Sequence, residues 1–512
     1  MFVRIHTAAL SGIDALRVTV EVNIAGGGIG LYLVGLPDNA VKESEQRIRA
    51  AFENSGEKMS ARKVVVNLAP ADLRKEGAAF DLPIAIGILA AMQRIGERKL
   101  AETMCCGELS LDGSVMAVRG VLSLAIAARE AGLKRLILPR ENAAEAAVVE
   151  GLEVIGVENL RQTIDYLNDD CEITPVRPNE AVLEQHPKSC YEEDFADVKG
   201  QSHVKRALEI AAAGGHNVLM IGSPGSGKTM LARRLPTILP PLTTEEALET
   251  TKIHSVAGLQ RFDGLMMRRP FRAPHHTASP VSLIGGGQSP RPGEVSLAHN
   301  GVLFLDELPE FGRSVLEVLR QPLEDREIVV SRARYNVAYP ANFTLVAAMN
   351  PCPCGYYNHP TKECVCSPAT VHRYMGRISG PLMDRIDMHI EVTPVDPAEL
   401  QSAAVGERSA VIRERVARAR AIQRDRFRGV EGVYTNARMN AAMLRAYCPL
   451  DEQSDLLLRR AMERLSLSAR ACDRILKVAR TIADLAGCER IEAADIAEAI
   501  GYRSLDREAW GN

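Results

Sequence analysis

The chain lacks any apolar segment long enough to cross a bilayer. Its longest apolar run, Leu82–Met92, has eleven residues, whereas a membrane-spanning helix needs about 20. The N-terminus also lacks a basic stretch followed by an apolar one, so no signal peptide is visible. We therefore expect a cytoplasmic location and no membrane partner.

The chain as a whole has no excess of positive charge. Its formal net charge is −3 at pH 7, so composition gives no global sign of nucleic-acid binding. Any contact with DNA must come from a local basic feature or from a surface that several subunits build together. The eleven cysteines are expected to be thiols or metal ligands rather than disulfides, because the expected compartment is reducing.

One strong motif is present, a glycine-rich loop between a predicted strand and a predicted helix. The apolar run Val218–Ile221 leads into G-x-x-x-x-G-K-T, and a helical pattern follows from Met230. In this context the loop predicts phosphate binding, because its backbone N–H groups can turn onto phosphate oxygens. Lys228 would reach the β- and γ-phosphates of ATP, and Thr229 would ligate Mg²⁺. The predicted nucleotide-binding residues of the loop are Gly222, Ser223, Pro224, Gly225, Ser226, Gly227, Lys228 and Thr229.

Two carboxylates follow the next buried strand of this region. Asp306 and Glu307 come directly after the apolar run that ends at Leu305, about 80 residues beyond the phosphate loop. Ligands bind at this end of the strands in open α/β sheets. Asp306 would therefore join the nucleotide-binding set by holding Mg²⁺ through water, and Glu307 would polarise the attacking water. A third strand, Thr344–Met349, repeats the pattern and ends at Asn350.

The N-terminal part carries a resemblance to a protease domain. Lys75–Asp81 resembles the segment that holds the nucleophile of Lon-type proteases, and residues 107–142 are similar to the rest of that domain. On this resemblance Ala79 falls at the serine position and Leu122 at that of the lysine general base. A Ser/Lys dyad needs a hydroxyl and an amine, and neither residue supplies one. The resemblance implies an inactive Lon-like α+β domain of the ribosomal S5 domain 2-like type, which would act as a scaffold or binding module.

Changes in pattern divide the chain into an α/β multidomain protein. The Lon-like domain is expected at residues 1–168, and a proline-containing linker without apolar periodicity at 169–196. Residues 197–395 carry the phosphate loop and the carboxylates, which predicts a P-loop α/β core. Residues 396–512 are predicted to be helical. Within the core, residues 254–299 form a long insertion with little regular pattern.

A second insertion, residues 326–340, predicts a β-hairpin with Arg332 and Arg334 near its tip. A solvated hairpin tip is one reading of this pattern. The other is a pore loop whose arginines contact DNA phosphates, multiplied by the number of subunits. Basic tips favour phosphates and aromatic tips favour polypeptide, so Tyr335 beside the arginines leaves a protein substrate open.

Four cysteines form two C-x-C pairs separated by nine residues, namely Cys352, Cys354, Cys364 and Cys366. Four thiolates on a short loop suit tetrahedral Zn²⁺. The C-x-C spacing is tighter than the usual ligand spacing of two to four residues. Two alternatives therefore stay open, free thiols that pack the loop and metal occupancy that depends on preparation.

The C-terminal helical region resembles the α-helical lid of AAA+ ATPases. On this resemblance Arg470 matches the sensor arginine of the lid, with Arg474 one turn further as the competing choice. Asn350 resembles the sensor residue near the γ-phosphate. Arg385 resembles the arginine that is projected into the neighbouring subunit's ATP site. The predicted catalytic residues are thus Glu307, Asn350, Arg385 and Arg470.

Taken together, residues 1–505 resemble the ComM/YifB family of bacterial Mg-chelatase-like AAA+ proteins. The most specific segments are Phe271–His276, Ser296–Glu310, Asn350–Gly355 and Ile378–Asp387. The resemblance implies a homohexameric ring with ATP sites between subunits. It also implies a DNA branch-migration helicase that extends recombination during natural transformation, alongside other recombination proteins. Composition and spacing alone give only an Mg·ATP hydrolase with an inactive Lon-like domain.

Two functions of different classes follow. The leading one is a hexameric DNA motor that acts on single-stranded or branched DNA and whose ATP hydrolysis is completed in trans by Arg385. The second is an ATP-dependent protein remodeller, or chelatase-like chaperone, that docks a client on the Lon-like domain. A third is an adaptor that binds ATP without hydrolysing it, and Glu307 counts against that reading.

Overall fold

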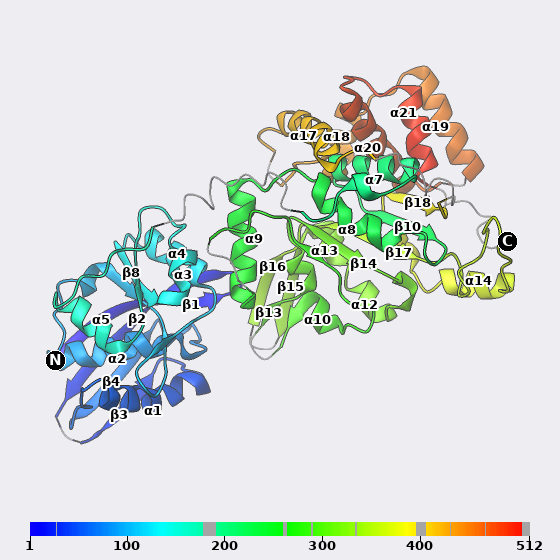
Figure 1. Ribbon diagram of the computed structural model, residues 1–512. Coiled ribbons are helices and arrows are strands. Elements are labelled where there is room, and N and C mark those ends of the chain that lie inside the picture. The colour runs from blue at the N-terminus through cyan, green and yellow to red at the C-terminus, as the bar shows by residue number, and fades with distance from the viewer. Residues whose placement is uncertain are drawn as a thin grey trace. The chain divides into compact units, whose positions relative to one another are not determined.

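The structure is a computed structural model. It describes residues 1–26, 28–177, 191–259, 264–287, 290–332, 335–395, 406–430, 432–465 and 467–503. The chain forms two compact units, which are Met1–His186 with Thr243–Met267, and Pro187–Leu242 with Arg268–Asn512 (Figure 1). No helix in these described ranges is long and apolar enough to cross a bilayer.

The N-terminal unit is built on a seven-stranded mixed sheet with the order β3-β4-β2-β1-β5-β8-β9. The strands are β1 (Phe2–Ser11), β2 (Asp14–Ala25), β3 (Gly30–Val34), β4 (Lys63–Ala69), β5 (Thr103–Cys105), β8 (Arg135–Pro139) and β9 (Glu153–Val157). Along β2 the side chains of Val18, Val20 and Val22 are buried. This period of two is the one that a strand with a single core-facing side requires.

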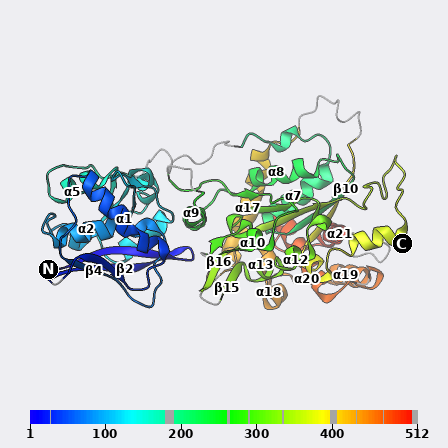
Figure 2. The same cartoon turned by 90° about the horizontal axis from the view of Figure 1, so that it is seen from below.

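Helices cover this sheet, and Figure 2 shows α1 (Asn39–Asn54) and α2 (Asp81–Ala91) together on one face. Every residue of α2 is buried, so the apolar run Leu82–Met92 is a core helix. Ala79 lies in the 3₁₀ turn before α2, and Leu122 is buried in the first turn of α3 (Val121–Glu130). No hydroxyl or amine stands at either position.

Helix α9 (Thr244–Ala257) groups with the N-terminal unit, although it follows the phosphate-loop helix in sequence. It packs on α3, where the Gly120 amide donates to the Ser255 carbonyl at 3.2 Å, and Lys252 pairs with Asp14. This grouping differs from the predicted division, which placed the whole of 197–395 in the core. The chain leaves the ATPase unit after Leu242 and returns at Arg268.

The second unit contains a five-stranded parallel sheet with the order β11-β14-β17-β10-β18. The strands are β11 (Phe271–Arg272), β14 (Val302–Leu305), β17 (Thr344–Met349), β10 (Val218–Gly222) and β18 (Met388–Val392). All residues of β10, β14 and β17 are buried, as expected for parallel strands covered on both faces. Among the helices beside the sheet are α7 (Ser202–Gly214) and α8 (Lys228–Ile238).

The insertion at 254–299 is more regular than its sequence indicates. Its described part holds the end of α9, then β11, α10 (Pro280–Ile284), β12 (Gly285–Gly286), β13 (Arg291–Pro292) and α11 (Glu294–Leu297). The prediction of little regular structure was therefore wrong. These elements are too short to show a period, and β11 exists because it pairs with β14 at the edge of the sheet.

The predicted hairpin at 326–340 is confirmed. Strands β15 (Glu327–Arg332) and β16 (Tyr335–Pro340) pair antiparallel, with Arg332 opposite Tyr335. The predicted contact residue Arg334 lies outside the described residues, as does the side chain of Arg332. The base of the hairpin is fixed, because Ile328 and Tyr339 are buried and the Tyr339 hydroxyl donates to the Pro290 carbonyl at 2.8 Å.

The predicted helical C-terminal region is confirmed. Its helices are α17 (Ser409–Arg426), α18 (Ala441–Tyr447), α19 (Glu452–Leu465), α20 (Ala469–Ala486) and α21 (Ala493–Gly501). Asp387, directly before β18, joins these helices to the sheet by pairing with Arg474 of α20 and accepting from the Asn217 amide at 2.8 Å. Burial opposes ionisation of this carboxyl, but Arg474 and His216 lower its pKa to about 2.

Asp387→Asn should destabilise the ATPase unit by about 3–5 kcal/mol, because it leaves the Arg474 guanidinium largely buried without its carboxylate. The folded pKa lies below the ordinary value of 3.8. The parent protein should therefore lose stability as pH falls from about 4 to 2, and the variant should lose less over that range. Calorimetric unfolding against pH measures both effects. The exposed Asp425→Asn serves as the control, and equal stability of Asp387→Asn and the parent would contradict the assignment.

Candidate functional site

The phosphate loop lies between β10 and α8, at the carboxyl edge of the parallel sheet. Gly225 and Gly227 have φ values of 78° and 91°, which favour glycine. A Cβ on Gly222 would lie 2.3 Å from the Val392 carbonyl oxygen, so the loop can begin only with glycine there. The hydroxyls of Ser223 and Ser226 are buried and have no hydrogen-bond partner among the described residues.

Lys228 is held inward at the centre of the loop. Its Nζ donates to the carbonyls of Gly222 at 2.7 Å and Ser223 at 3.0 Å, and to Asn350 Oδ1 at 3.3 Å. Burial lowers the pKa of Lys228, whereas Asp306 and Glu307 raise it. The structure thus brings the ammonium group together with the amide that ends β17. Their roles toward phosphate stay predictions.

Thr229 and Asp306 form the second predicted pair of the site. Thr229 Oγ1 donates to Asp306 Oδ2 at 2.7 Å. A hydroxyl oxygen and a carboxylate oxygen are the hard donors that Mg²⁺ prefers. Both groups are reachable from solvent, and they stand at the ends of neighbouring segments of one sheet. The donor set therefore fits the predicted ion.

Glu307 follows Asp306 in a left-handed conformation, with φ of 53°, and its side chain is 55% exposed. His276 Nδ1 lies 3.3 Å from Glu307 Oε2, and the His275 ring lies beside that of His276 at 4.1 Å. Sequence reasoning missed this contact. The available signal was the position of His276 just after β11, since neighbouring parallel strands end at the same edge of a sheet.

Arg385 does not project from this chain. Its guanidinium is buried, donates to the Pro381 carbonyl at 2.5 Å and pairs with Glu324 of α13 (Arg320–Asp325). The structure does not place Arg385 beside Lys228 or Asp306. To serve a neighbouring subunit it would have to leave the Glu324 ion pair, and that role stays a prediction.

The two lid arginines have different surroundings. Arg474 pairs with the buried Asp387 and ties α20 to the sheet, which is a structural task. Arg470 is 70% exposed and lies 3.8 Å from Asp384. Of the two, Arg470 is therefore the one whose guanidinium is accessible, and its role as a sensor stays a prediction.

The four predicted metal-ligating cysteines lie together on the loop after β17. The sulfur atoms of Cys352, Cys354, Cys364 and Cys366 are all within 4.8 Å of one another. Desolvation opposes ionisation of Cys354, but hydrogen bonds from the Tyr356 backbone and the Cys352 thiol lower its pKa to about 6. Since the thiolate is the form that binds metal, this cluster is arranged to hold a metal ion.

Lys228→Ala should abolish nucleotide binding, because no other described cation replaces the ammonium group inside the loop. Isothermal titration calorimetry with ADP and with ATP measures the loss. Lys362→Ala on the cysteine loop is the matched control, since its Nζ lies 4.8 Å from the Tyr356 ring centroid rather than at the phosphate loop. Retained ATP affinity in Lys228→Ala would refute the assignment of the loop.

Comparisons with known proteins agree with this geometry. Three family profiles match successive parts of the chain. Subunit ChlI of Mg-chelatase matches residues 20–142, magnesium chelatase, subunit ChlI, matches 194–400, and the magnesium chelatase subunit ChlI C-terminal profile matches 406–503. A Lon protease of Lachnoclostridium phytofermentans is 24% identical over 170 residues, which are 31% of this chain and 21% of that protein.

Two relatives match over almost their whole length. Competence protein ComM of Haemophilus influenzae is 44% identical over 507 residues, or 98% of this chain and 97% of that protein. The protein YifB of Escherichia coli is 43% identical over 506 residues, with the same shares. The chain therefore belongs to the ComM/YifB family of magnesium chelatase-like proteins, a family of AAA+-like ATPases.

Proposed function

We propose that the chain is a cytoplasmic, ATP-driven DNA motor that assembles as a homohexameric ring. Its most specific form is a branch-migration helicase that promotes homologous recombination during natural transformation. The observation that carries the proposal is the convergence of Lys228, Thr229, Asp306 and Asn350 at the ends of three neighbouring strands, with Glu307 next to Asp306. The 44% identity to Competence protein ComM supports the link to transformation.

Hydrolysis at this site would divide the work among residues that already touch. Lys228 would bind the β- and γ-phosphates, and Thr229 with Asp306 would hold Mg²⁺, which neutralises phosphate charge. Glu307 would orient the attacking water and accept its proton. His276, 3.3 Å from Glu307 Oε2, would position that carboxylate. Asn350 would contact the γ-phosphate from the Lys228 side.

The hairpin β15–β16 would contact DNA. Its base is held by buried Ile328 and by Tyr339, so the hairpin is tied to the ATPase unit at one end and carries Arg332 at the other. In a ring, each subunit would contribute the same pair of arginines, Arg332 and Arg334, to one basic surface. This local basic feature answers a chain whose net charge is −3.

A protein remodeller is the second candidate function. Helix α9 belongs to the Lon-like unit, yet it begins at Thr244, six residues after α8 ends at Ile238. Movement of α8 on hydrolysis would pull on a domain that could dock a protein client. An ATPase stimulated by a polypeptide and indifferent to DNA would favour this function.

The four-cysteine cluster would bind a structural Zn²⁺. Four thiolates within 4.8 Å of one another match the number and softness of ligands in closed zinc sites. The ion would tie the two ends of the loop together. Other recombination proteins are expected as partners of the assembled ring.

Arg385→Ala should leave ATP binding intact and abolish hydrolysis if this arginine acts across a subunit interface. Fingers of this kind contribute about 10³–10⁵ in rate. The sharpest test mixes Arg385→Ala with Lys228→Ala subunits, because each lacks what the other supplies. Mixed rings should regain ATPase activity. Mixing without any gain, or full turnover by Arg385→Ala alone, would rule out action in trans, and Glu324→Gln controls for loss of the Glu324 ion pair.

Arg332→Ala combined with Arg334→Ala should weaken DNA binding and flatten its dependence on salt, because each phosphate contact removed lowers the slope by about 1. Fluorescence anisotropy with labelled single-stranded DNA across a salt titration measures this. Arg428→Ala with Arg459→Ala is the matched control, since both arginines are exposed elsewhere on the same unit. Equal affinity of the hairpin variant and the parent at every salt concentration would refute the hairpin contact.

A further inference from the structure

The loop between β17 and α14 (Pro368–Met375), which carries the four cysteines, lies against the phosphate loop. A Cβ on Gly355 would stand 2.5 Å from Cδ of Pro224. Gly355 also has a φ of 84°, a conformation that favours glycine. The cysteine loop thus approaches the tip of the phosphate loop as closely as a backbone without a side chain allows.

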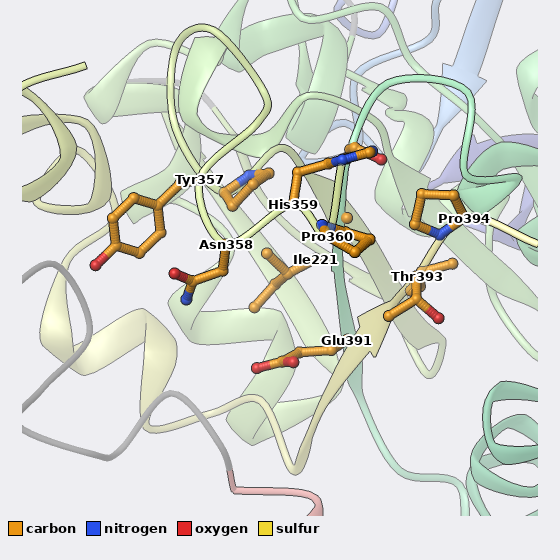
Figure 3. A pocket seen from close by; sticks show the side chains of 12 residues that line it. Ile221, Tyr357, Asn358, His359, Pro360, Glu391, Thr393 and Pro394 are labelled. Atoms are coloured by element: carbon orange, nitrogen blue, oxygen red, sulfur yellow. The ribbon is translucent and has the colours of Figure 1, made fainter. Parts of the chain in front are cut away.

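Beyond this contact the cysteine loop forms one wall of a pocket. The pocket is lined by residues 221–223 at the end of β10, by 357–360 of the cysteine loop and by 391–394 at the end of β18, together with Pro351. In Figure 3, Asn358 and Pro360 lie around Ile221, and Glu391 and Thr393 form the side that belongs to β18. The pocket therefore starts at the first residues of the phosphate loop.

The side of β10 on which the pocket lies decides what it can hold. Asp306 and Asn350 end β14 and β17, which lie on one side of β10, and β18 lies on the other. Lys228 contacts Asn350, so the terminal phosphate of a nucleotide would sit on the β17 side. The rest of the nucleotide must then extend along the loop toward β18.

We propose that this pocket receives the ribose and base of the nucleotide and that residues 357–360 of the cysteine loop form its outer wall. The inference rests on the proposed ATP site and adds a residue set to it. It also gives the metal cluster a task, since Cys352 and Cys354 precede these residues and Cys364 and Cys366 follow them.

The chemistry of the walls suits a nucleoside. Asn358 offers an amide and Glu391 a carboxylate, which can pair with base edges and ribose hydroxyls, and Ile221, Val392 and Pro360 add apolar surface. The β18 wall is fixed by α7, because His203 Nε2 lies 2.8 Å from the Glu391 carbonyl and Gln201 Nε2 donates to the Thr393 carbonyl at 2.5 Å.

The cysteine-loop wall depends on its own ends. The His359 ring accepts the Thr361 and Lys362 amides at 3.1 Å and stands edge-on to the Tyr356 ring at 5.6 Å. These contacts are all local to the loop. A metal ion bound to cysteines on both sides would close the loop, and closure reduces the entropy lost when the wall is ordered around a ligand. Metal occupancy should therefore set the affinity for the nucleoside part.

Calorimetry with ADP and with inorganic tripolyphosphate separates the two ends of the site. Asn358→Gly with His359→Ala removes both side chains, and glycine keeps the φ of 57° at position 358. This variant should bind ADP about tenfold more weakly, as the loss of one or two hydrogen bonds predicts, and tripolyphosphate within about twofold of the parent. Lys362→Ala should bind both probes like the parent.

ADP affinity of the double variant equal to that of the parent would overturn the inference and leave the ATP site standing. A parent protein that binds neither ADP nor tripolyphosphate would overturn the ATP site, and this inference with it. The two failures are therefore distinguishable in one set of titrations.

The metal arm uses the same probes. The parent should hold about one Zn²⁺ per chain, and Cys364→Ser with Cys366→Ser should hold none. Removing the ion with a chelator should weaken ADP about tenfold and leave tripolyphosphate unchanged, and added Zn²⁺ should restore the parent but not the variant. ADP affinity that is indifferent to metal removal would overturn the link between cluster and pocket.

Discussion

The placement of β10 between β17 and β18 is the constraint on which the rest of the ATPase unit depends. Because the three strands are parallel and fully paired, their carboxyl ends meet at one edge, and the polar groups that follow them are brought together without any contact in sequence. Lys228 can then reach the amide of Asn350 at 3.3 Å. A shift of β10 by one residue would reverse which side chains face this edge.

The same arrangement divides the site into two halves. The β14 and β17 side carries the acidic and amide groups suited to Mg²⁺ and the terminal phosphate. The β18 side carries a pocket whose outer wall comes from the cysteine loop. Asp387, at the start of β18, adds a third link by holding Arg474 of the helical region. Chemistry, nucleotide recognition and lid attachment thus meet on neighbouring strands of one sheet.

The sequence predicted the parts of this site that depend on local pattern. The phosphate loop, the strand before Asp306 and the strand before Asn350 each carry an apolar run followed by a polar residue, and the parallel sheet does the rest. The grouping of α9 with the Lon-like unit depends on Lys252 and Ser255 meeting Asp14 and Gly120, which no periodicity reveals. The burial of Arg385 against Glu324 and the approach of Gly355 to Pro224 likewise depend on residues far apart in the chain.

The central claim is that ATP hydrolysis at this edge drives movement along DNA. The most direct measurement is strand displacement on a synthetic four-way DNA junction, with the ATPase rate recorded in the same reaction. The account predicts that junction DNA raises the ATPase rate and that strands separate only with hydrolysable ATP and an intact Lys228. An ATPase rate indifferent to DNA, with the junction left whole, would contradict it.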